Sequence, residues 1–218
     1  MSKALKVLVN SRMPSGVAAI VIGAVLLAFS FTATAQTISD PCAACHGDTY
    51  QKWKVSGHPY KLMEAAKAQN RPIPLPVGYN WDDISFVIGG YKWKSRYMDE
   101  DGWIITNDES SEGGNTQYNM LTGKWSDYHA DEANGTKPYD CGSCHTTNWV
   151  ANPDPTNLDG NHQRLPGIWG DFEAGGIQCI QCHGDNHPGN IPEMDDEVRG
   201  CGACHIRGEA DTIPASGG

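Results

Sequence analysis

The sequence predicts a fold made mostly of loops and short helices, with one small β-hairpin. Glycine and proline account for 25 and 13 of the 218 residues, and hydrophobic periodicity is weak over the last third of the chain. The eight cysteines fall into four close pairs that share one local pattern. A segment with so few periodic apolar residues cannot form an ordinary core, so we expect its apolar mass to come from something other than side chains.

Each cysteine pair is followed at once by a histidine. The four motifs are Cys42-Ala-Ala-Cys45-His46, Cys141-Gly-Ser-Cys144-His145, Cys179-Ile-Gln-Cys182-His183 and Cys201-Gly-Ala-Cys204-His205. C-x-x-C-H is the attachment signature of c-type haem. Two thiols on one turn of chain reach the two vinyl groups of a porphyrin, and the next residue ligates the iron as proximal ligand. The predicted fold class is therefore a multihaem cytochrome c packed around four covalently bound haems c.

Zinc sites and disulfides are the alternatives to haem. A C-x-x-C pair can supply half of a zinc site, and it can also act as a redox-active dithiol. In an exported chain, disulfides are the default expectation. None of these alternatives requires histidine directly after the second cysteine, and none predicts it four times in four.

The remaining histidines match the number of distal iron ligands that four haems need. They are His58, His129, His162 and His187. Surface histidines are the plain alternative, and methionine can also serve as a sixth ligand, with Met63, Met98, Met120 and Met194 present. Iron with two imidazole ligands changes charge state with little rearrangement and at low potential, and it leaves no open position for a substrate. The count therefore favours an electron-transfer protein over an enzyme.

The N-terminus has the layout of a cleaved secretory signal peptide. Basic residues Lys3, Lys6 and Arg12 precede an apolar run of 15 residues, 17–31, and Ala-Thr-Ala follows at 33–35. The alternative is a retained membrane anchor, but the run is shorter than the ~20 residues of a span. We expect residues 1–35 to be removed and residues 36–218 to form a single tetrahaem domain without stable membrane insertion.

The charge of the expected mature chain is strongly negative. The leader takes three of the 16 basic residues and none of the 26 acidic ones, which leaves a formal charge of −13. Such a surface repels nucleic acid and anionic lipid, and it suits a cationic redox partner or an oxidised metal surface.

Motif spacing is uneven, because successive second cysteines are 99, 38 and 22 residues apart. We expect the last three haem sites to be crowded together and the first to stand apart. In the long first interval, the pattern predicts a helix over 60–70, a strand over 84–88, and a hairpin of residues 91–97 and 103–106 around a turn at 99–102. Its aromatic face would stack on a haem or form a small aromatic core.

Several segments together resemble multihaem c-type cytochromes, a family that includes tetrahaem electron carriers and larger multihaem oxidoreductases. They are the first motif with Trp53 and Ser56-Gly57-His58, the run Gly89 to Tyr97, Tyr118-Asn119 with Trp125, Cys144-His145-Thr146-Thr147, and Gly175 to Gly184 with His187. The resemblance covers most of the expected mature chain. It implies bis-histidine ligation, a continuous haem stack, and self-association into an extracellular filament in which His58 ligates a haem of the neighbouring subunit.

Three functions compete. The first is a filament subunit for extracellular electron transfer to partner proteins or metal oxides. The second is a soluble periplasmic electron shuttle. The third is a multihaem reductase with one open haem, against which the histidine count argues.

Overall fold

The computed structural model describes residues 38–110, 114–152, 154, 156–160, 164–184 and 201–205. All eight cysteines lie in these ranges, together with six of the eight histidines. The predicted leader, the distal candidates His162 and His187, and Met194 lie outside the described residues. Among the described residues, no helix has both the length and the apolar character that a membrane span needs.

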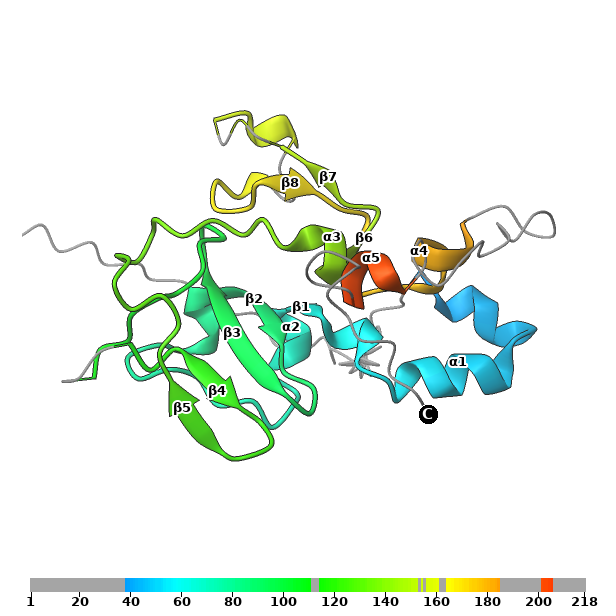
Figure 1. Ribbon diagram of the computed structural model, residues 1–218, viewed down its shortest axis with the longest axis horizontal. Coiled ribbons are helices and arrows are strands. Elements are labelled where there is room, and N and C mark those ends of the chain that lie inside the picture. Colours follow the sequence, from blue (N-terminus) through cyan, green and yellow to red (C-terminus); the bar gives the residue numbers. More distant parts are fainter. Residues whose placement is uncertain are drawn as a thin grey trace, which may run out of the picture. The chain divides into compact units, whose positions relative to one another are not determined.

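The main element is a five-stranded antiparallel sheet whose strands lie in sequence order (Figure 1). Its strands are β1 (Leu62–Glu64), β2 (Ile84–Gly89), β3 (Lys94–Asp99), β4 (Gln117–Asn119) and β5 (Lys124–Ser126). Two-residue strands form two further ladders, β6 (Thr146–Thr147) with β9 (Ala174–Gly175) and β7 (Val150–Ala151) with β8 (Gly170–Asp171). The predicted small hairpin is thus part of a larger sheet.

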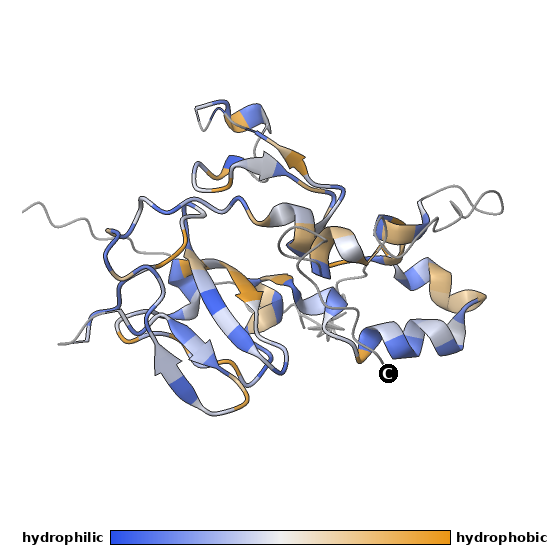
Figure 2. Ribbon diagram, viewed as in Figure 1, coloured by the Kyte–Doolittle hydropathy of each residue, from blue (hydrophilic) through white to orange (hydrophobic). Residues whose placement is uncertain are grey.

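Each face of the sheet carries its own core. Leu62, Phe86 and Met98 pack on one face with Tyr139 and Ile168. On the other face, Met63, Val87 and Tyr97 pack with Ala68, Ile73 and Ile105. Neighbouring strand residues therefore alternate between the two cores, and Figure 2 shows β2 in the hydrophobic colour. Ile84 joins the second core because the register shifts between Ile84 and Phe86.

All helices are short. They are η1 (Asp40–Ala44), α1 (Gly47–Lys54), η2 (His58–Tyr60), α2 (Ala65–Ala68), η3 (Trp81–Asp83), α3 (Gly142–His145), η4 (Leu158–Gly160), α4 (Cys179–His183) and α5 (Gly202–His205). Figure 1 shows α1, α3, α4 and α5 beyond the β1 edge of the sheet. This agrees with the predicted loops and single turns around the last three motifs.

The predicted helix over 60–70 is wrong in its first half. Leu62 and Met63 are both fully buried but lie in opposite cores, which a strand allows and a single helix face does not. They belong to β1, which pairs with Phe86–Ile88 of β2, and only Ala65–Ala68 is helical. Burial of both residues against the sheet outweighs the local helix propensity.

The strand predicted over 84–88 is confirmed as β2, and the hairpin is confirmed only in part. The turn at 99–102 forms, since the Gly102 N–H donates to the Asp99 carbonyl oxygen at 3.0 Å. The return segment makes only an isolated bridge, Ile104 with Met98, and β3 pairs mainly with β2 and β4. No common aromatic face forms, because Tyr97 is buried whereas Trp93 is 68% exposed.

Candidate functional site

Each C-x-x-C-H motif folds as one helical turn. The backbone N–H of His46 donates to the Cys42 carbonyl oxygen at 2.8 Å, and that of His205 donates to Cys201 at 2.9 Å. The second and third motifs form α3 and α4. A single turn presents both thiols and the imidazole on one side of the chain, which is the arrangement that covalent haem attachment requires. None of the eight cysteines, all of which the structure describes, forms a disulfide.

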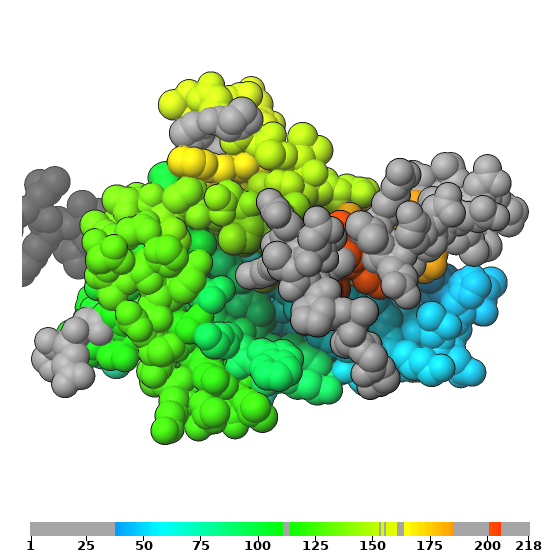
Figure 3. Space-filling view, viewed as in Figure 1, coloured from blue at the N-terminus to red at the C-terminus, as the bar shows by residue number. Residues whose placement is uncertain are grey.

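Contacts of cysteine thiols with backbone carbonyl oxygens bring the second and fourth motifs together. The Cys144 Sγ lies 3.8 Å from the Ala203 carbonyl oxygen, and the Cys204 Sγ lies 3.6 Å from that of Ser143. The second motif therefore touches the fourth. The helix of the fourth motif, α5, is visible at the surface in Figure 3, where it is red.

The pKa values of several thiols are shifted by burial and by thiols of neighbouring motifs. Burial raises the pKa of Cys42, and the thiol of Cys179 raises it further. Burial likewise raises the pKa of Cys182, with an added contribution from Cys201. Burial and the neighbouring Cys144 raise the pKa of Cys204 to about 11. The first motif thus lies against the third, and the third lies near enough to the fourth for their thiols to interact electrostatically. These upward shifts of the thiol pKa are opposite in direction to the lowered thiol pKa of a reactive dithiol.

The expectation that the first motif stands apart is wrong. Directly before it, the buried Ser39 hydroxyl donates to the Gln178 side-chain oxygen at 2.8 Å and accepts from the Cys179 N–H at 3.0 Å. The buried Thr147 hydroxyl, just after the second motif, accepts from the Gln178 N–H at 2.9 Å and donates to the Gly176 carbonyl oxygen at 2.8 Å. We call Ser39, Thr147 and Gln178 the central polar cluster. It joins three motifs in the interior, where an unpaired polar group would be costly.

At two histidines the Nδ1 atom of the ring lies beside an acceptor oxygen. The Nδ1 of His145 lies 3.1 Å from the Lys61 carbonyl oxygen, and the Nδ1 of His129 lies 2.8 Å from a Glu132 carboxylate oxygen. Both oxygens only accept, so Nδ1 is the donor in each ring, and in the neutral form of the ring Nε2 is the unprotonated nitrogen. Metal-bound histidines typically donate their other ring N–H to a carbonyl or carboxylate oxygen in this way.

The segment His58–Leu62 contacts three of the motifs. His58 accepts a hydrogen bond from the Ile177 N–H at 2.8 Å, just before the third motif, and its ring faces that of His205 in the fourth. Lys61 holds His145 of the second motif. Burial lowers the pKa of His58, and the charges of Lys61 and His205 add smaller shifts in the same direction. The sequence singled out His58 but gave no signal for Lys61, which acts through its backbone.

Glycine is required where the third motif passes this segment. Gly176 has a φ of +72°, and a Cβ there would lie 2.5 Å from the Pro59 carbonyl oxygen. A Cβ at the preceding Gly175 would lie 2.7 Å from the Leu62 carbonyl oxygen. The pair Gly175-Gly176 therefore allows two chain segments to touch at the centre of the site.

Trp149, which follows the second motif, explains why that motif has glycine at position 142. A Cβ at Gly142 would overlap the ring of Trp149, and Trp149 in turn packs on Tyr139 and Phe172. The Thr146 hydroxyl also donates to the Gly142 carbonyl oxygen at 2.7 Å. The first sheet core thus holds the second motif in place.

Methionine is a poorer candidate than histidine for the sixth ligand. Met63 and Met98 are 2% and 0% exposed within the two sheet cores, where they serve as packing residues. Met120 packs against the second core.

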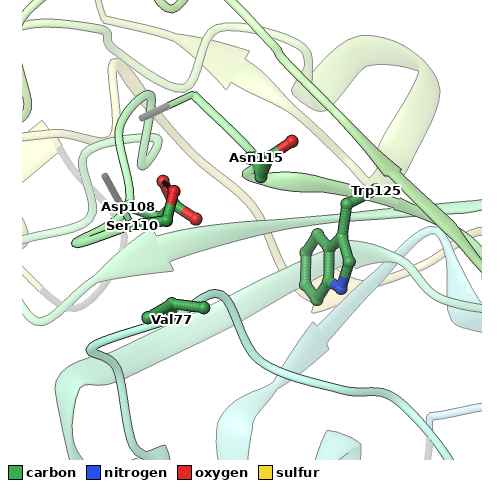
Figure 4. Close-up of a pocket in the computed structure, with 5 residues that line it drawn as sticks. All are labelled: Val77, Asp108, Ser110, Asn115 and Trp125. Carbon is green, nitrogen blue, oxygen red and sulfur yellow. Dashed lines mark hydrogen bonds between the residues drawn. The ribbon is translucent and has the colours of Figure 1, made fainter. Parts of the chain in front are cut away.

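A separate hollow of about 230 Å³ lies near the opposite edge of the sheet (Figure 4). Its lining residues are Val77, Asp108, Ser110, Asn115 and Trp125. Cysteine and histidine do not line it, so it is separate from the motif cluster. Among the described residues, no three His, Cys, Asp or Glu side chains converge as a metal site.

No family model matches the chain, and no curated protein matches it. Two solved structures are similar to part of it. The outer cell wall cytochrome OcwA is 20% identical with a TM-score of 0.44, over 66% of this chain and 30% of OcwA. The undecahaem cytochrome from the S-layer of Carboxydothermus ferrireducens is 19% identical with a TM-score of 0.41, over 67% of this chain and 20% of that cytochrome. The chain thus spans less than a third of either neighbour. Both likenesses are weak, and neither bears on function.

Proposed function

We propose that this chain is a tetrahaem c-type cytochrome that transfers electrons. The observation that carries the proposal is that four C-x-x-C-H sequences each fold as one helical turn and lie together in one cluster. The cysteines would hold each porphyrin through two thioethers, and His46, His145, His183 and His205 would be the proximal ligands. Bound haem supplies reversible one-electron chemistry of iron.

The protein residues would fix the ligands and set the potentials. The Lys61 carbonyl oxygen orients His145, and Glu132 orients His129 and increases the basicity of its ring. With His58, His129, His162 and His187 as distal ligands, all four irons would be closed to substrates. That coordination suits an electron relay at low potential rather than an enzyme.

The finer proposal is a subunit of an extracellular cytochrome filament. The motifs resemble those of outer-membrane cytochrome E, a tetrahaem protein that polymerises into such filaments. Redox proteins or metal oxides outside the cell would be its partners, and residues 1–35 would direct export and then be cleaved off. A soluble periplasmic shuttle is the alternative, and a reductase with one open haem is the less favoured one.

Haem content tests the proposal directly. The chain is produced in cells that attach c-type haem, and intact mass and the pyridine haemochrome spectrum give the number of haems per chain. We expect four, and three after Cys141→Ala with Cys144→Ala, whereas Ser143→Ala in the same motif keeps four. A purified chain that carries zinc or disulfides and no covalent haem would refute the proposal. Electron microscopy at high protein concentration separates the filament from the monomeric shuttle.

A further inference from the structure

Two histidine rings from distant parts of the chain lie close together, with their planes nearly perpendicular. The ring centres of His58 and His205 lie 6.2 Å apart, with an angle of 89° between the planes. His205 belongs to the fourth motif, whereas His58 follows α1. A metal–imidazole bond is about 2 Å long, so an iron with one imidazole on each side separates the ring centres by about 6 Å. The observed separation is the one that a shared iron needs.

The backbone of His58 is fixed in this position. Its carbonyl oxygen accepts from the Ile177 N–H at 2.8 Å, and the Trp53 indole N–H donates to the Ile177 carbonyl oxygen at 2.8 Å. Gly176 lets the two segments approach, since a Cβ there would lie 2.9 Å from the His58 carbonyl oxygen. His58 is thus held against the chain that leads into the third motif.

Ser56 selects the ring form that can ligate iron. Its hydroxyl donates to the Trp53 carbonyl oxygen at 2.7 Å, which uses its only proton. Toward the His58 Nδ1, 3.4 Å away, the hydroxyl therefore acts as an acceptor, and Nδ1 carries the proton of the neutral ring. The Nε2 atom is then unprotonated, as in the His145 and His129 rings.

We propose that His58 and His205 are the two axial ligands of one iron, that of the haem attached at Cys201 and Cys204. The inference rests on the proposed function, because it needs haem at the fourth motif. It assigns the distal ligand to the same chain and not to a neighbouring subunit. It also links the first motif to the fourth haem through the eleven residues that lie between His46 and His58.

A pair of variants tests the assignment. His58→Ala is compared with the unaltered protein, and both are then made in a background with Cys201→Ala and Cys204→Ala, which lacks the fourth haem. The readouts are haem count and the high-spin fraction from the ferric optical and paramagnetic resonance spectra. Val55→Ala, in the same loop and 63% exposed, is the matched control. His58→Gln repeats the test with a larger side chain, in case the alanine variant fails to fold.

We expect His58→Ala to keep four haems and to make about one in four high-spin, and added imidazole to restore the low-spin form. In the background without the fourth haem, the same substitution produces no high-spin haem. A high-spin haem that persists there would overturn the pairing, because His58 would then serve another haem. Fully low-spin spectra in His58→Ala would also overturn it, since the two rings would then make only an edge-to-face contact.

The state of assembly separates this assignment from ligation by a neighbour. Monomeric unaltered protein should have four low-spin haems at any dilution. A high-spin haem that develops as assemblies dissociate would overturn ligation within the chain. Failure of the proposed function itself is distinguishable, because it appears as missing covalent haem in the unaltered protein.

Discussion

Replacing Thr147 by valine tests whether the central polar cluster holds the motifs together. Valine has nearly the same shape, so the change leaves no cavity and removes only the hydroxyl. Thr147 is fully buried, and its hydroxyl accepts from the Gln178 N–H at 2.9 Å and donates to the Gly176 carbonyl oxygen at 2.8 Å. Each group left unpaired costs about 1–3 kcal/mol, so we expect a loss of about 2–4 kcal/mol in the free energy of unfolding.

Urea unfolding of the haem-loaded protein, followed by tryptophan fluorescence, measures this loss. For a chain of this size it corresponds to a melting temperature lower by roughly 5–15 °C. The control is Thr122→Val in the exposed turn between β4 and β5, where we expect a change within about 0.5 kcal/mol. Equal effects of the two substitutions would refute the reasoning, because the buried hydroxyl would then contribute no more than an exposed one.

Three further predictions concern single side chains. Gly176→Ala, at a φ of +72° and against backbone carbonyls, should lower the free energy of unfolding by at least about 2 kcal/mol in the same urea assay. Glu132→Gln, which removes the charge beside His129, should raise the midpoint potential of one haem by roughly 20–40 mV in a redox titration, the equivalent of a half-exposed ion pair. Burial raises the pKa of Asp99 above its usual 3.8, so its folded form binds a proton more tightly than its unfolded form, and stability falls as the pH rises through the folded pKa. Asp99→Asn should flatten that slope in urea midpoints measured across pH, and an unchanged slope would contradict the assigned cause.

Local patterns predicted the motif helices because the attachment chemistry is itself local. A C-x-x-C-H sequence needs one turn of helix, and all four motifs form one. The strand at β2 was also predictable, since residues 84–88 are apolar apart from Ser85 and the run ends at a glycine pair, 89–90. These features depend on a few neighbouring residues, which the sequence displays directly.

Features that depend on distant contacts were not predictable. Leu62 and Met63 lie in a stretch with good helix propensity, but they pair with β2 as a strand because both can then be buried. The approach of the first motif to the third depends on Ser39, and a lone serine before a cysteine pair carries no local signal. Lys61 contacts His145 through its backbone carbonyl oxygen, so the type of side chain at position 61 gives no hint of this contact.

The long interval between the first and second motifs has a structural consequence. The chain leaves the cluster at Leu62, builds the sheet and returns to the same place at His145, whose ring bonds the Lys61 carbonyl oxygen. The motifs do not meet in their order along the sequence. The first lies against the third, and the second lies against both the third and the fourth. Haems attached at these thiols should be neighbours in the same way, because each porphyrin is tethered at its own pair of cysteines. The sheet, built entirely between the first and second motifs in the sequence, therefore forms outside the cluster and returns the chain to it.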